Sequence, residues 1–273
     1  MAKKAGPYIG VTGFMSRAEV NEALAMIPEG STHRLMVGIL MSSKTFTGLP
    51  NKWPGRYPKK EAAADIFIDD PRALNLIHYN TDNRDQLHHE LTDITRFVGA
   101  DRFDGFQINM RWPCATELRN YQSIFPDKII VMQVGGGALE DVGRIGHLGG
   151  LLYLCYDHRA CCSWIVDSIL IDPSGGKGMP LNAEEGAVHL RDVRDHYHTK
   201  EIGIGIAGGL GPETLHLIEP LMREFPDLSI DAEGRLRTPQ PEDALDLEKM
   251  RNYLKGAYAL LEGECNAAHS PAV

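Results

Sequence analysis

The sequence predicts one (β/α)8 TIM barrel, an α/β fold, as a single domain over residues 1–273, and three observations support this prediction. The chain length is close to the roughly 250 residues of such a barrel. Eight short apolar runs alternate with longer stretches of helical periodicity. No hairpin signal joins consecutive runs, so the strands are expected to be parallel. An open doubly wound sheet is the alternative, but no G-x-G-x-x-G follows the first strand.

The predicted strands are rich in Ile, Val, Leu and Phe and too short for helices, which is typical of strands buried on both faces. They cover residues 8–12, 35–41, 73–79, 103–110, 128–134, 165–172, 202–207 and 228–231. Two connections are longer than a minimal unit. Residues 45–60 form a loop rich in Pro, Gly and Lys, and residues 135–164 are expected to hold extra helix.

The predicted helices occupy the stretches between these strands. They cover residues 16–27, 82–98, 116–125, 182–198, 212–225 and 245–261. Ser16 followed by Glu19 is a capping-box pattern, and Asn182 with Glu185 marks another helix start. Pro212 after Gly211 is expected in the first turn of its helix, where proline is tolerated.

Composition excludes several classes of protein. An apolar content of 43% and a charged content of 24% are typical of globular proteins. The net charge of −9 argues against a general nucleic-acid or membrane-surface binder. No apolar run approaches the roughly 20 residues of a membrane span, and no secretory signal is apparent, so a cytoplasmic protein is expected. Five cysteines without a C-x-x-C pair predict buried thiols rather than disulfides or a metal site.

The loops that follow the strands are where this fold carries its chemistry. Asp172 ends the sixth strand and precedes a glycine loop at residues 175–178, which contains Lys177. Such a loop can present an acid above the barrel and surround an anion with backbone N–H groups. After the seventh strand, Gly208 and Gly209 lead toward a helix, whose N-terminus can bind phosphate. Together the two motifs predict an acid beside an anion site.

These two motifs resemble those of the phosphoribosylanthranilate isomerase family, which carries L-L-D with a G-G-x-G loop and then A-G-G-L-x-P-E. The fourth strand, with Gln107 and Asn109, is similar to the family's Q-L-H-G. His78 to Asn80 resembles its F-V-N, and Arg56 with Tyr57 resembles its arginine–tyrosine pair. The likeness spans most of the chain and is strongest at strands six and seven.

The resemblance implies an Amadori rearrangement, in which an aminoaldose phosphate opens and becomes an aminoketose. The reaction needs a general acid at the ring oxygen and a base for the C2 proton. By this resemblance Asp172 is the acid. Thr12 stands where the family has its base cysteine. A threonine hydroxyl stays protonated near neutral pH, so Thr12 can donate a hydrogen bond but is a poor base.

The eighth strand also differs from the family's D-V-S-S-G-V-E. Asp231 is retained, but Glu233 replaces hydroxyls that would bind phosphate. Glu233 is either the replacement base, facing Asp172 across the barrel mouth, or an exposed loop residue. Gly234 and Arg235 follow it, and Arg235 is a candidate cation between Glu233 and a phosphate.

Other polar residues at strand ends complete the candidate site. His78 is either a group that titrates near neutral pH or a buried core histidine. Gln107 and Asp231 are expected to contact the substrate, and Arg56 is expected to bind a second anionic group. Further cations fall in the loops after strands, which favours an anionic ligand. They are Lys44, Arg111, Lys177, Arg235 and Arg237.

The sequence therefore predicts an acid–base isomerase acting on a small phosphorylated sugar derivative, without a cofactor or metal. A lyase or hydrolase that uses Asp172 and Glu233 on another small anion is the alternative on the same fold. A non-catalytic sugar-phosphate-binding barrel is a third. No nucleic-acid or membrane partner is expected, and a homodimer is the default state of association.

Overall fold

Eight parallel strands close into a barrel in the computed structural model, which describes residues 5–149, 152, 165–174, 180–197 and 202–268. Each strand pairs with its neighbours in chain order, and β1 also pairs with β8. The strands are β1 (Tyr8–Thr12), β2 (Arg34–Ser42), β3 (Ala73–Asn80), β4 (Gly105–Asn109), β5 (Ile129–Gly135), β6 (Ser168–Asp172), β7 (Gly203–Ala207) and β8 (Ser229–Ala232). The predicted TIM-barrel fold is confirmed, and each predicted strand is present.

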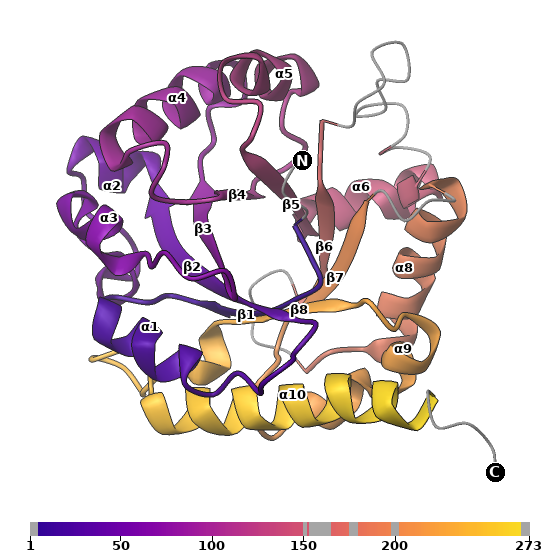
Figure 1. Ribbon diagram of the computed structural model, residues 1–273. Coiled ribbons are helices and arrows are strands. Elements are labelled where there is room, and N and C mark those ends of the chain that lie inside the picture. The colour runs from indigo at the N-terminus through magenta and orange to yellow at the C-terminus, as the bar shows by residue number, and fades with distance from the viewer. Residues whose placement is uncertain (1–4, 150–151, 153–164, 175–179, 198–201, 269–273) are drawn as a thin grey trace.

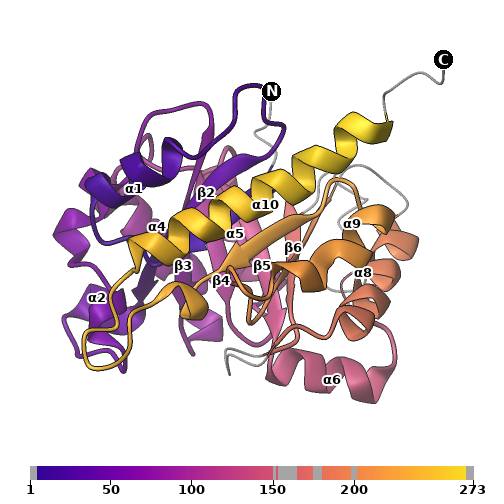
Figure 2. The same cartoon turned by 90° about the horizontal axis from the view of Figure 1, so that it is seen from below.

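Helices form a ring outside the strands, as Figure 1 shows. They are α1 (Arg17–Leu24), α2 (Ser43–Thr47), α3 (Ala63–Ile66), α4 (Leu87–Val98), α5 (Ala115–Ile124), α6 (Gly137–Ile145), α8 (Ala183–Tyr197), α9 (Glu219–Glu224) and α10 (Leu247–Ala268). Short 3-10 turns are η1 (Pro54–Arg56), η2 (Lys60–Ala62), η3 (Arg84–Gln86), η5 (Leu215–Ile218) and η6 (Gly234–Leu236). Helix α10 crosses one side of the barrel (Figure 2). No described helix is long and apolar enough to cross a membrane.

Several element boundaries differ from the sequence predictions. The capping box at Ser16 and Glu19 is present. The helix predicted at 212–225 is present as η5 and α9 but starts later than predicted, because η5 begins at Leu215 and Pro212 lies in the turn before it. Residues 45–60 are not one irregular loop, since they include much of α2 and all of η1. Helix α6 follows β5 as the regular helix of that unit, and most of residues 150–164, where extra helix was expected, lie outside the described part.

The core has two parts that follow from the alternation of side chains along each strand. The larger cluster lies between barrel and helices and includes Ile9, Val37 and Ile77. Its smaller counterpart fills the barrel interior and includes Tyr8, Met36 and Leu76. Odd and even positions of a strand therefore face different cores, so the inward residues of every strand can be identified by their spacing of two.

Candidate functional site at the barrel mouth

The inward positions change from apolar to polar toward the carboxyl ends of the strands. On β1 the inward series from Tyr8 ends at Thr12, and on β6 the series from Leu170 ends at Asp172. The same change occurs on β3, where His78 follows Leu76, and on β5, where Gln133 follows Val131. The resulting polar layer contains Thr12, His78, Gln107, Gln133, Asp172 and Asp231, all of them buried. This is the end of the barrel where active sites of this fold lie.

Two glycines on the first strands leave room for this layer. A Cβ on Gly10 would lie 2.7 Å from Asp231 Oδ1 and 2.7 Å from Met36 Cε. A Cβ on Gly38 would lie 2.5 Å from Thr12 Oγ1. Real Cβ atoms do not tolerate such contacts. The barrel interior therefore has room for the side chains of Thr12 and Asp231 because Gly38 and Gly10 next to them have no Cβ.

A chain of hydrogen bonds joins the two aspartates across the mouth. Gln107 Nε2 donates to Asp231 Oδ2 at 3.1 Å and to Gln133 Oε1 at 3.0 Å. Gln133 Nε2 donates to Asp172 Oδ2 at 3.0 Å. Ser174 Oγ donates to the other oxygen of Asp172 at 2.7 Å. Two glutamines therefore hold both carboxylates, from β6 and β8, in fixed orientations.

The acidity of Asp231 in this layer is strongly altered. Burial raises the pKa of its carboxyl to about 7, against the opposing hydrogen bonds from Gln107 and Thr12. Glu233 and Asp172 raise the pKa further through repulsion. Thr12 Oγ1 lies 3.0 and 3.1 Å from the two Asp231 oxygens. Asp231 was expected to bind substrate, yet its acidity suits proton transfer near neutral pH.

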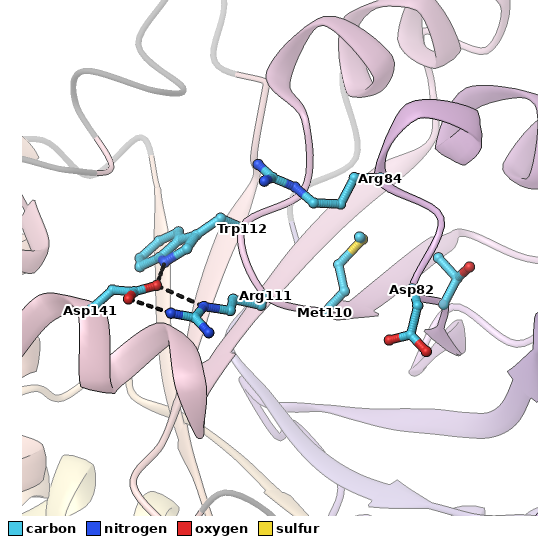
Figure 3. Close-up of a pocket in the computed structure, with 7 residues that line it drawn as sticks. Asp82, Arg84, Met110, Arg111, Trp112 and Asp141 are labelled. Atoms are coloured by element: carbon cyan, nitrogen blue, oxygen red, sulfur yellow. Dashed lines mark hydrogen bonds and ion pairs between the residues drawn. The ribbon is translucent and has the colours of Figure 1, made fainter.

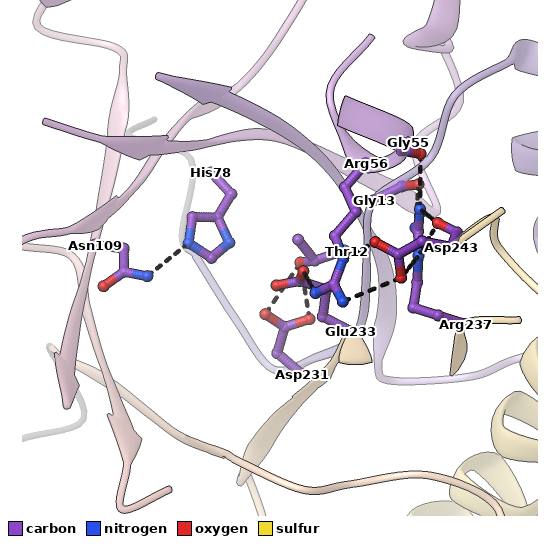
Figure 4. A network of polar contacts seen from close by, with 10 residues as sticks. All are labelled: Thr12, Gly13, Gly55, Arg56, His78, Asn109, Asp231, Glu233, Arg237 and Asp243. Carbon is purple, nitrogen blue, oxygen red and sulfur yellow. Dashed lines mark hydrogen bonds and ion pairs between the residues drawn. The ribbon is translucent and has the colours of Figure 1, made fainter. Parts of the chain in front are cut away.

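His78 lies at the opposite side of the same mouth (Figure 4). Its Nε2 is 3.0 Å from Asn109 Nδ2, an amide donor, so Nε2 accepts and Nδ1 carries the hydrogen. Burial lowers the pKa of His78 despite the nearby carboxylates of Glu233 and Asp172. His78 is therefore a neutral, buried histidine at neutral pH.

The rim beside β8 holds an ion-pair cluster (Figure 4). Arg56 Nη1 donates to Glu233 Oε1 at 2.8 Å, and its Nε donates to Asp243 Oδ2 at 2.6 Å. Arg56 therefore places a cation beside Glu233, the position for which Arg235 was the candidate. Two protein carboxylates already occupy the guanidinium that was expected to bind a second anionic group of the substrate.

Arg237 was predicted among the loop cations that favour an anionic ligand, but its side chain does not face solvent. Its side chain is only 2% exposed. It donates to the carbonyl oxygens of Gly13 at 3.0 Å, Gly55 at 2.9 Å and Asp243. These oxygens belong to the segments after β1, β2 and β8. One buried guanidinium therefore binds three rim segments together.

The glycine segment after β7 contacts the acid site directly. Gly208 and Gly209 have φ angles of +101° and +63°, which favour glycine. A Cβ on Gly208 would lie 2.6 Å from Asp172 Oδ1. A Cβ on Gly211 would lie 2.8 Å from Arg235 Cβ, so the segments after β7 and β8 touch. Gly234 faces open space, and Lys177 lies outside the described residues.

The remaining candidates lie apart from the polar layer. Lys44 is in α2, and Arg111 pairs with Asp141 of α6. His88 Nδ1 is 2.6 Å from Glu117 on the outer helices. Among the described residues no three His, Cys, Asp or Glu side chains are grouped to hold a metal ion. Cys114 is a free, half-buried thiol.

Sequence reasoning missed three residues of the mouth. Gln133 was predictable, because it continues the inward spacing of two from Val131. Gly10 carried no local signal, since its importance comes from Asp231 on β8. Asp243 also contacts Arg56 only through the fold, 187 residues away in sequence.

Comparisons with known proteins give structural likeness only. No family model matches the sequence, and no curated protein matches it. TrpF from Jonesia denitrificans is similar, with a TM-score of 0.57, 11% identity and coverage of 93% of this chain and 97% of that one. Active domain 2 of the Pyrococcus furiosus chitinase is similar with a TM-score of 0.55 and 12% identity, and the match covers 99% of each chain. The Rubisco of Pyrococcus horikoshii OT3 is similar with a TM-score of 0.51 and 16% identity, and the match covers 97% of this chain and 61% of that one. Likenesses at this identity establish the TIM-barrel fold.

Proposed function

We propose that this TIM barrel is an acid–base isomerase of a small phosphorylated sugar derivative, with Asp172 and Asp231 as its proton-transfer groups. The observation that carries the proposal is the hydrogen-bonded chain from Asp231 through Gln107 and Gln133 to Asp172. A pair of oriented carboxylates at the carboxyl ends of the strands supplies what an aldose–ketose rearrangement needs, and no cofactor takes part.

The two aspartates have different roles in this proposal. Asp172 gives a proton to the ring oxygen, the bond from C1 to that oxygen breaks, and the sugar opens. Asp231 removes the C2 proton to give an enolamine. Asp231 then returns that proton to C1 while the C2 hydroxyl gives its proton to Asp172, so the aminoketose forms with no atom gained or lost. A pKa of about 7 allows Asp231 to accept a proton near neutral pH. Thr12 orients Asp231 in place of supplying the base.

We assign the base to Asp231 rather than Glu233 because of their surroundings. Glu233 is 25% exposed and accepts from Arg56. This ion pair favours the charged form of the Glu233 carboxylate, but Arg56 occupies an oxygen that a base would need for accepting a proton. Asp231 is buried, and Gln107 and Gln133 link it to Asp172 in the hydrogen-bonded chain.

The phosphate of the substrate is assigned to the segments after β7 and β8, where many barrels of this fold bind phosphate. Gly209 has a positive φ, and Arg235 packs against Gly211. Gly234 has nothing within 4 Å of where a Cβ would lie. Together with Gly208 these residues provide backbone N–H groups and a guanidinium for a phosphate.

A hydrolase on the same fold is the second candidate. It is favoured by the three carboxylates of Asp172, Asp231 and Glu233 at a mouth where Arg56 is already paired. Hydrolysis of a glycosidic bond also uses two carboxyl groups. Product analysis separates the two, because an isomerase gives one product of unchanged mass and a hydrolase gives two.

The test uses the fluorescence of phosphoribosylanthranilate, whose loss reports the rearrangement. We expect turnover by the wild type and a loss of about 10²-fold or more in Asp231→Asn, the usual scale of a proton-transfer group. Glu233→Gln is the matched control at the same rim and should retain activity within a few-fold. Equal losses in both variants, or no turnover at high enzyme concentration, would overturn the proposal.

A further inference from the structure

A separate hollow of about 330 Å³ lies beyond the carboxyl ends of β3 and β4 (Figure 3). Arg84 reaches it from η3, Met110, Arg111 and Trp112 from the segment after β4, and Asp141 from α6. None of these side chains belongs to the hydrogen-bonded chain between the two aspartates. Its volume is within the usual range for small-molecule sites.

Trp112 has an unusual backbone conformation in this hollow. Its φ is +47°, in the left-handed region that bulky residues rarely adopt. Its indole Nε1 donates to Asp141 Oδ2 at 2.9 Å, which fixes the ring at the edge of the hollow. Backbone outliers of this kind cluster at ligand sites. The fold therefore holds the half-buried Trp112 in a backbone conformation that tryptophan rarely adopts.

Within the described part of the chain, two charged side chains that line the hollow, Arg84 and Asp82, form no ion pair. Arg111 is paired through two bonds with Asp141, at 2.8 and 2.5 Å. Arg84 has no carboxylate partner within the part of the chain that the structure describes. Figure 3 shows its guanidinium on the side of Trp112, whereas Asp82 points to the other side. Arg84 and Trp112 thus line the same hollow.

We propose that this hollow binds a mononucleotide, with its base against the Trp112 indole and its phosphate at Arg84. Bases stack on aromatic side chains regardless of their identity. A guanidinium suits phosphate because its planar N–H groups form paired hydrogen bonds. A neutral apolar ligand would leave Arg84 unused, and a phosphate without a ring would leave Trp112 unused. The proposal is independent of the reaction at the barrel mouth.

The experiment titrates the full-length protein with AMP, adenosine and ribose 5-phosphate. The indole N–H cross peak of Trp112 is followed by nitrogen-15 NMR and assigned through its absence in Trp112→Phe. We expect millimolar or tighter binding of AMP with a shift of this peak. Adenosine should bind more weakly, and ribose 5-phosphate should leave the peak unmoved even if it binds at the mouth.

Three variants separate the contributions. Arg84→Gln should weaken AMP about tenfold, the loss of a charge-assisted contact, and leave adenosine within twofold. Trp112→Leu should weaken AMP and adenosine alike, whereas Trp112→Phe should retain most AMP binding by affinity measurement. Arg96→Gln on α4 is the matched arginine control and should bind AMP as the wild type does. A wild type that does not bind AMP, or Arg84→Gln that binds it unchanged, would overturn the proposal.

Discussion

Asp231→Asn is expected to change how the stability of the protein depends on pH. Folding raises the pKa of the Asp231 carboxyl to about 7, mainly through burial, from roughly 3.9 in an unfolded chain. Between these values the native state binds more protons than the unfolded state. The stability contributed by this raised pKa is therefore fully present below the unfolded pKa and is lost as pH rises through about 7. Asparagine does not titrate.

The expected change in the free energy of unfolding follows from the part of this pKa shift that lies between pH 5 and pH 8. From pH 5 to pH 7 the native state holds the extra proton over about two pH units, and each unit is worth about 1.4 kcal/mol. The wild type should thus lose about 3 kcal/mol relative to Asp231→Asn between pH 5 and pH 8. Asp167, whose pKa burial raises to about 6, is common to both proteins and cancels in the difference.

Urea unfolding of both proteins at pH 5 and pH 8, with m values compared, measures this difference. Asp101→Asn, a change at an exposed carboxylate, is the control and should follow the wild type at both pH values. If the difference between wild type and Asp231→Asn were the same at both pH values, Asp231 would titrate normally. Its assignment as the proton acceptor would then fail as well.

Four further outcomes are expected from the same structure. The activity of the wild type should rise with pH through about 7, as Asp231 ionises, and a profile that is flat there would contradict its role as base. Gly10→Ala should reduce activity and stability by about 1–3 kcal/mol in urea unfolding, because its Cβ displaces Asp231; unchanged kinetics would disprove this packing. Arg237→Met should cost about 3–5 kcal/mol, since it leaves three rim carbonyls without their buried donor, and a loss under 1 kcal/mol would show that water replaces it. Arg56→Gln should reduce activity less than Asp231→Asn does, measured as kcat/KM, because its guanidinium is bound by two rim carboxylates and takes no part in proton transfer.

The barrel was predictable from the sequence because its signal is repeated eight times. Each strand satisfies the same requirement, a short run buried on both faces, so an error of a few residues at one strand leaves the count unchanged. The late start of the helix after β7 was not predictable. Pro212 suggested a first helical turn, and Gly211 does accept from the N–H groups of Thr214 and Leu215, but the regular helix, η5, starts only at Leu215.

The candidate site was predictable only in part. Asp172, Asp231, Gln107 and His78 lie within two residues of the carboxyl ends of their strands, and these ends converge in this fold. Partners that are distant in sequence were not predictable, because charge alone does not say which carboxylate an arginine meets. Arg56 was expected to bind a ligand, and its two carboxylate partners come from the segment after β8.

The buried guanidinium of Arg237 also divides the rim into two halves that tolerate change differently. The segments after β1, β2 and β8 share one donor, so altering the backbone of any one of them disturbs the other two. In the part of the chain that the structure describes, this donor makes no hydrogen bond to the segments after β3 and β4. Attempts to give the barrel a new specificity should therefore succeed more often with insertions after β3 and β4, whereas grafts after β1, β2 or β8 should reduce the yield of folded protein.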